Sequence, residues 1–238
     1  MCTVTLIPVK NKFVLTSNRD EAIGRKTLPI DSYHVNDTRM LFPKDQVAGG
    51  TWIAASEHQQ MICLLNGGYQ NHTKLNMYRH SRGVVVTDIL SGNSLSKDME
   101  AYNCEGLEPF TLVGVDWSNE LAFYELVWDG KKKHFSKLDT SIPHIWSSST
   151  LYTDEMKQMR KDWFADYQLN NKIDINSIIN FHKTGGVGNE FYDLQIKRGD
   201  LQTRSITQVY LDNDSPIMRY EDLIINRVFE TSFEPVNS

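Results

Sequence analysis

Short apolar runs alternate with polar residues at the start of the chain. Residues 3–7 and 12–16 are rich in β-branched and apolar side chains, and the turn-forming segment 8–11 separates them. This pattern predicts a β-hairpin. Because the second strand of a hairpin runs antiparallel to the first, residues 17–20 would return to a place beside Cys2.

Further strands are predicted where apolar residues alternate with polar ones or form short runs between turn residues. The continuous run at 61–65 is typical of a strand covered on both faces, and Cys63 within it is expected to be a small core residue. Asp129 and Gly130 predict a hairpin turn. The expected strands are 49–56, 60–66, 110–115, 120–128, 134–138, 203–211, 217–221 and 226–230.

Helical spacing occurs in four segments, two near the middle of the chain and two later. Ser81 is expected to cap the first helix, a shorter one follows at about 94–104, and Asp174 is expected to cap a helix that reaches residue 183. The strongest pattern is at 153–169, where methionine and aromatic side chains form one stripe, which indicates core packing.

Residues 22–50 lack this periodicity. Charged residues, prolines and glycines alternate there, which predicts a long connection with one short strand at most. Arg25, Lys26 and Arg39 in this segment would either contact an acidic substrate or lie on solvated surface.

The composition fits one globular domain over residues 1–238. With 40% hydrophobic and 23% charged residues, the chain can form a sizeable core. The net charge of −5 and pI near 5.8 argue against nucleic acid as a partner. Three cysteines without a CxxC pair indicate a reducing compartment, and no secretory signal or long apolar segment is apparent, so a cytoplasmic protein without a transmembrane segment is expected.

No cofactor or metal is expected. The seven histidines show no paired short spacing that would favour a metal site. The glycine-rich segment 184–189 lacks the GxGxxG order and follows a predicted helix, which argues against nucleotide binding. The sequence leaves a homo-oligomer open.

Candidate chemistry is concentrated at Cys2. If Met1 is removed, Cys2 carries a thiol and a free α-amine on one carbon. A cysteine thiol titrates near ~8.5 and an α-amine near ~7.7–8.0, so the neutral amine can take the thiol proton and act as general base.

The tetrad Asn18-Arg19-Asp20-Glu21 would lie beside this nucleophile in the predicted hairpin. Arg19 would favour the thiolate, and Asp20 would accept a hydrogen bond from the amine. The alternative is a charged turn at the end of a surface hairpin. Asn66 precedes two glycines, where a backbone can approach a ligand closely, although a plain Asn-Gly turn explains the same residues.

Three motifs together resemble the NRDE family, which includes proteins of the transport and Golgi organisation 2 type. They are Met1-Cys2-Thr3-Val4, the tetrad at 18–21 and the segment from Gly49 to Ile53. The NRDE family is in turn similar to N-terminal-nucleophile hydrolases of the penicillin V acylase and bile salt hydrolase type. The resemblance implies an α+β fold, a four-layer αββα sandwich, and an amide hydrolase.

The resemblance also implies roles for further residues. Asn66 matches a strand-end Asn that contributes to the oxyanion hole, and Arg204 matches an Arg that completes the site. Ser148 stands where the resembled enzymes have a second oxyanion Asn, which is a departure from the pattern, because a serine hydroxyl reaches less far than an amide.

The predicted function is hydrolysis of a linear amide in a small acyl-amide or peptide. Cys2 would attack the carbonyl, Arg19 and Arg204 would orient the substrate, Asp20 would hold the amine and Asn66 the oxyanion. The alternative is a non-catalytic protein that binds a small molecule or partner in trafficking or lipid handling.

Overall fold

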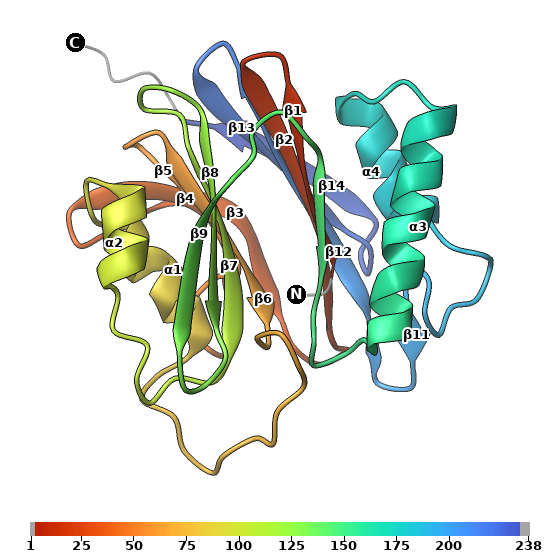
Figure 1. The fold of residues 1–238 in the computed structure, drawn as a ribbon, viewed down its shortest axis with the longest axis horizontal. Coiled ribbons are helices and arrows are strands. Elements are labelled where there is room, and N and C mark those ends of the chain that lie inside the picture. Colours follow the sequence, from red (N-terminus) through yellow and green to blue (C-terminus); the bar gives the residue numbers. More distant parts are fainter. Residues whose placement is uncertain (1–2, 234–238) are drawn as a thin grey trace.

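Two stacked antiparallel sheets with helices on both outer faces form the structure, a computed structural model that describes residues 3–233 (Figure 1). Each sheet has seven strands within the described residues. Helices α1 and α2 cover one sheet and α3 and α4 cover the other. The predicted αββα sandwich is therefore confirmed.

The first sheet contains both ends of the described chain. Its strand order is β10-β1-β2-β12-β13-β14, and β11 pairs with β12. In the hairpin of β1 and β2, Thr3 pairs with Asn18, which confirms the predicted return of the tetrad toward the start of the chain. The strands are β1 (Thr3–Val9), β2 (Lys12–Ala22), β10 (His144–Ser147), β11 (Lys197–Arg198), β12 (Leu201–Asp212), β13 (Ser215–Asp222) and β14 (Arg227–Ser232).

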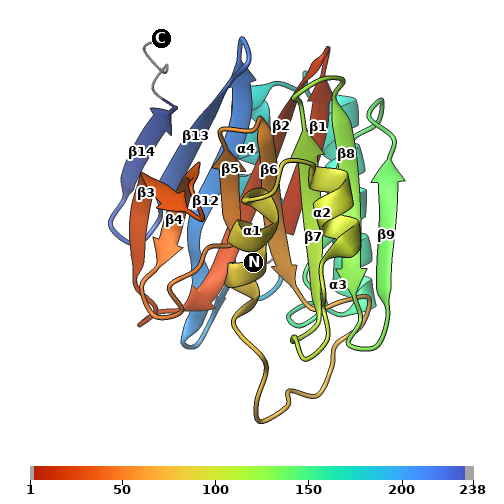
Figure 2. The same ribbon diagram turned by 90° about the vertical axis from the view of Figure 1, so that its left-hand side faces the viewer.

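The second sheet is a meander in which each strand pairs with the next along the chain (Figure 2). Its strands are β3 (Thr27–Val35), β4 (Thr38–Asp45), β5 (Ile53–Ser56), β6 (Gln60–Asn66), β7 (Phe110–Asp116), β8 (Ala122–Trp128) and β9 (Lys133–Leu138).

The expectation of a long connection over residues 22–50 is wrong, because β3 and β4 form a hairpin there. Asn36 and Asp37 make its two-residue turn with φ values of 48° and 64°. Asn and Asp tolerate this left-handed conformation, which matches the twist of a hairpin. Residues 144–147 also form a strand that was not expected, paired with β1.

The four predicted helices are present, and their caps follow the expected chemistry. Ser81 Oγ accepts a hydrogen bond from the Gly83 N–H at the start of α1, and Asp174 forms a capping box with Ser177 at the start of α4. The helices are α1 (Arg82–Leu90), α2 (Leu95–Ala101), α3 (Asp154–Asn170) and α4 (Ile175–Thr184).

Three apolar layers hold these elements together. The largest lies between the sheets and includes Leu15, Trp52, Cys63 and Tyr220. Separate clusters fill the space under α1 and α2 and under α3 and α4. Cys63 is fully buried, and burial raises the pKa of its thiol to about 12, so Cys63 is a core residue as expected.

No helix among residues 3–233 combines the length and the apolar character needed to cross a membrane.

Candidate functional site

Strand β2 presents the tetrad to both sides of its sheet, because successive side chains of a strand point to opposite faces. Arg19 stacks on Trp52 in the layer between the sheets, whereas Asn18 contacts His182 on α4 at the outer face. Cys2 lies outside the described residues. Thr3, the first described residue, pairs with Asn18, one position before Arg19.

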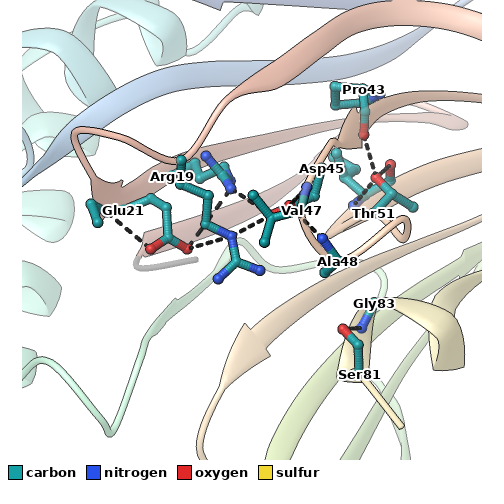
Figure 3. Close-up of polar contacts among 12 residues, drawn as sticks. Arg19, Glu21, Pro43, Asp45, Val47, Ala48, Thr51, Ser81 and Gly83 are labelled. Carbon is teal, nitrogen blue, oxygen red and sulfur yellow. Dashed lines mark hydrogen bonds and ion pairs between the residues drawn. The ribbon is translucent and has the colours of Figure 1, made fainter.

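Arg19 is a buried cation, only 3% exposed. Its Nη2 lies 2.9 Å from Asp45 Oδ2 and 3.8 Å from Glu21 Oε2 (Figure 3). Its guanidinium carbon lies 4.3 Å from the centre of the Trp52 ring. Burial lowers the pKa of Arg19, and the nearby carboxylates offset only part of that effect. The two carboxylates therefore do not fully offset the cost of burying this guanidinium.

Asp45 anchors Arg19 and was not identified from the sequence. Its Oδ2 also accepts a hydrogen bond from Arg25 Nε at 2.7 Å, and its Oδ1 accepts from the N–H groups of Val47 and Ala48. Burial alone raises the pKa of Asp45, but the Ala48 hydrogen bond and the Arg25 ion pair outweigh it and lower the pKa overall. An Asp that binds N–H groups two and three positions ahead is a common turn pattern, which is the signal the sequence offered.

A polar cavity of about 100 Å³ opens beside this ion pair. We name it the arginine cavity, and the residues that line it include Arg19, Arg25, Asp45, Trp52, Asn66 and Arg82. Arg25, for which solvated surface was one of two expectations, contributes to it with a side chain 36% exposed.

Two glycines bring the start of α1 against the arginine cavity. A Cβ on Gly50 would lie 2.8 Å from the carbonyl carbon of Gly83, and Gly49 has a φ of +72°. A side chain on Gly50 would therefore collide with the α1 backbone, whereas at Gly49 only the left-handed backbone conformation disfavours one. The segment from Gly49 to Trp52 thus packs against the start of α1, where Ser81 caps Gly83 (Figure 3), and the start of α1 lines the same cavity as Arg19.

Asn66 ends β6 and lines the arginine cavity, as expected for a residue that approaches a ligand. Ser148 Oγ donates a hydrogen bond to the Asn66 carbonyl oxygen at 2.7 Å, and Ser147 pairs with Thr3 at the start of β1. These two contacts connect Asn66 to the end of β1 that Cys2 precedes. Because its single proton goes to this carbonyl, Ser148 is a positioning group for Asn66 in this geometry.

A second cavity of about 310 Å³ lies on the other side of the β6 end. We name it the serine cavity, and its lining includes Leu65, Glu125, Trp146, Ser147, Ser148 and Lys161. It is the more apolar of the two cavities. Asn66 lines the small charged cavity, and its chain neighbours Leu65 and Gly67 line the larger, less polar one.

Asp20 is buried on the outer face of its sheet. Its carboxylate accepts hydrogen bonds from the Tyr152 hydroxyl and from Thr203 Oγ1. Asp20 and Arg19 thus act in different layers, and the role of Asp20 toward an amine at Cys2 stays a prediction.

Arg204 occupies a bulge in β12, where the register shifts between Thr203 and Ser205. Its side chain donates a hydrogen bond to the Ile23 carbonyl, and it does not line the arginine cavity. The structure brings Arg19 and Asn66 together and leaves Arg204 outside that cavity, so a role for Arg204 also stays a prediction.

A buried polar network under β1 and β2 involves the first residue of the tetrad. The Asn18 side chain donates to the carbonyls of His182 and Leu194 and contacts His182 Nδ1, and His182 Nε2 lies 2.8 Å from Thr5 Oγ1. Burial lowers the pKa of His182 to about 3, so the imidazole is neutral near pH 7. Asn18 therefore ties α4 to the sheet.

This network predicts acid sensitivity of the fold. The His182 pKa is lower in the folded state than the ordinary value near 6.5, so the unfolded chain binds more protons below pH 6.5, and stability falls as the pH drops toward 3. Between pH 7.5 and 5 the expected loss is about 2 kcal/mol of unfolding free energy. Urea unfolding of the native protein and of His182→Gln would measure it.

Two features make this test specific. Most carboxylates titrate near pH 4, below this window. His182→Gln should flatten the pH dependence even if it lowers the overall stability, whereas His34→Gln, a change of an exposed residue, should keep the native slope. An equal slope in the native and His182→Gln proteins would contradict the prediction.

Among residues 3–233, no group of three or more His, Cys, Asp or Glu side chains is arranged to hold a metal ion.

Solved structures show the same fold as this chain. Penicillin V acylase from Agrobacterium tumefaciens aligns with 100% of this chain and 87% of its own, with a TM-score of 0.59 and 10% identity. A variant of conjugated bile acid hydrolase from Clostridium perfringens aligns with 99% of this chain and 94% of its own, with a TM-score of 0.63 and 10% identity. The Caenorhabditis elegans ortholog of N-acylethanolamine-hydrolyzing acid amidase aligns with 87% of this chain and 92% of its own, with a TM-score of 0.60 and 11% identity.

These similarities define the class of the fold as that of the N-terminal-nucleophile hydrolases. The sequence model of the Transport and Golgi organisation 2 family matches residues 1–230, and the chain belongs to that family. No curated protein matches the chain in sequence.

Proposed function

We propose that the protein hydrolyses a linear amide bond with Cys2 as its nucleophile. The observation that carries the proposal is the place of Asn66: it ends β6 beside Arg19 in the arginine cavity, and Ser148 connects it to β10, the partner of β1. No hydrogen bond of the Asn66 side-chain amide is found among residues 3–233, which leaves this donor available to a ligand.

The register of the first hairpin supports the position of the nucleophile. Thr3 pairs with Asn18, so the described part of β1 begins opposite the residue that precedes Arg19, one position after Cys2 in the sequence. A cation beside a thiol favours the thiolate, and the chain shares its fold with an N-acylethanolamine-hydrolyzing acid amidase.

The reaction would proceed in two steps. The Cys2 thiolate attacks the carbonyl carbon, its α-ammonium group gives a proton to the leaving nitrogen, and the C–N bond breaks to leave a thioester. Water, deprotonated by the same amine, then attacks the thioester and releases the acid and the thiol. Asn66 would donate to the oxyanion in both steps.

The effect of Asn66→Ala on turnover tests the oxyanion role. Loss of one oxyanion donor typically lowers kcat by about 100-fold or more, with little change in KM. Steady-state kinetics on linear acyl amides, with protein expressed from its native start and without an N-terminal tag, would measure this. Ser148→Ala is the companion variant and should lower kcat less, because Ser148 acts on the Asn66 carbonyl. Unchanged kcat in Asn66→Ala would contradict the role.

A second candidate function is ligand binding without turnover. The geometry of Ser148 favours it, because the hydroxyl that replaces a second oxyanion donor gives its proton to Asn66. The two functions differ in one measurement: a panel of linear acyl amides and aminoacyl peptides should show turnover in the first case and saturable affinity alone in the second.

A further inference from the structure

Three arginines among the described residues line the arginine cavity, and they face two carboxylates. Asp45 is saturated by Arg19, Arg25 and two backbone N–H groups. Glu21 lies 3.8 Å from Arg19 and 3.7 Å from Arg25, beyond hydrogen-bond distance. Within the lining itself three cations thus meet two carboxylates, and the third carboxylate, Glu108, lies against Arg82 outside the lining.

Two buried donors in this lining lack hydrogen-bond partners. Arg19 Nη1 and Trp52 Nε1 are both without a partner within residues 3–233, and the two side chains are 3% and 5% exposed. Buried N–H groups in folded proteins are nearly always paired, because an unpaired one costs free energy. These donors indicate that a ligand group completes the site.

The N-terminus of α1 adds a third element on the same side. Ser81, Arg82 and Gly83 all line the arginine cavity. The helix dipole favours an anion at this end, although the Gly83 N–H is already bonded to Ser81 Oγ. Burial lowers the pKa of Arg82, and Glu108, 3.3 Å from its Nη2, offsets only part of this effect.

The volume limits what can bind. About 100 Å³ is far less than the roughly 300 Å³ of a small-molecule pocket, whereas the serine cavity reaches that size. We propose that the arginine cavity binds a compact anionic group, a carboxylate or a phosphate, on the leaving-group side of the substrate. The serine cavity then receives the acyl group, and Asn66 lies between them at the amide. This assignment of the two sides rests on the proposed function.

Ligands that share the butyryl amide and differ in the charged end of the leaving group test the proposal. N-butyrylglycine, its neutral amide and butyryl-ethanolamine phosphate are titrated into the Cys2→Ala protein by calorimetry. The acid or the phosphate should bind at least about tenfold more tightly than the neutral amide, and the tighter of the two identifies the anion. Equal affinity for all three would overturn the proposal.

Variants locate the site. Arg82→Gln should remove most of the preference for the anion without weakening the neutral amide, and Glu21→Gln should strengthen anion binding. Arg79→Gln is the matched control, since Arg79 donates to the Asn103 carbonyl and does not line the cavity. Circular dichroism checks the fold of each variant. If Arg82→Gln does not fold, the anion affinity of Glu21→Gln tests the site instead. An affinity equal to that of the unsubstituted site would overturn the proposal.

The outcome separates this proposal from the proposed function. Selective anion binding by Cys2→Ala, without hydrolysis of any ligand by the native protein, would support the site and contradict the enzyme. Hydrolysis of charged and neutral amides with equal kcat/KM would support the enzyme and overturn the anion site.

Discussion

Replacing Cys2 with alanine should abolish amide hydrolysis and leave the fold intact. The variant loses the thiol that forms the thioester, and neither described cysteine replaces it, since Cys63 and Cys104 are both buried and burial raises the pKa of each thiol. Removal of a covalent nucleophile commonly lowers kcat by at least about a thousandfold. Kinetics on linear acyl amides and the thermal midpoint of unfolding measure the two halves of this expectation.

Two controls define the result. Cys63→Ala should keep turnover and lower stability, because it opens a gap between the sheets. The intact mass must first establish that Met1 is absent, because a retained methionine would convert the α-amine of Cys2 into an amide nitrogen without basicity. Full activity of Cys2→Ala would exclude the proposed mechanism.

Replacing Asp45 with alanine should destabilise the protein by about 3 kcal/mol, because it leaves the Arg19 charge buried without its closest partner. It also removes the acceptor for the N–H groups of Val47 and Ala48. Urea unfolding at pH 7 gives the free energy, and a lower midpoint with an unchanged slope would identify a stability effect.

Matched variants separate the buried pair from ordinary charge loss. Asp154→Ala removes a partner of Lys157 at a carboxylate whose side chain is 83% exposed, and should have a much smaller effect. The double variant Arg19→Met, Asp45→Leu should recover much of the stability lost in Asp45→Ala, because it removes both charges. Equal effects of Asp45→Ala and Asp154→Ala would contradict the role of this ion pair.

The elements of the fold could be predicted where pattern and turn chemistry agree. Apolar pattern and turn or cap residues occur together in the first hairpin at residues 3–16, in the hairpin at Asp129-Gly130 and in the capped helices. The structure matches the prediction at each of them. The hairpin of β3 and β4 was missed because its outer strand is largely exposed, so its side chains carry no clear alternation. Only the turn at Asn36 and Asp37 marked it.

The candidate site was predictable only in part, because residues that are far apart in the sequence line the same cavity. Arg19 and Asn66 belong to recognisable motifs, and they do share a cavity. Asp45 and Arg82 reach the same cavity from separate elements, through the close approach of Gly50 and Gly83. No local pattern encodes such a contact, since it depends on how α1 packs on the sheet.

The two faces of β2 have a consequence for the evolution of chains with this tetrad. Asn18 holds α4 in place through His182, whereas Arg19 faces the cavity between the sheets. Selection for folding alone would retain the first residue of the tetrad after catalysis had been lost. The motif by itself therefore does not distinguish an active descendant from an inactive one. A substitution at Asn66, with Asn18 and the buried Arg19–Asp45 pair unchanged, would mark a lineage that kept the scaffold and lost the amide that lines the cavity.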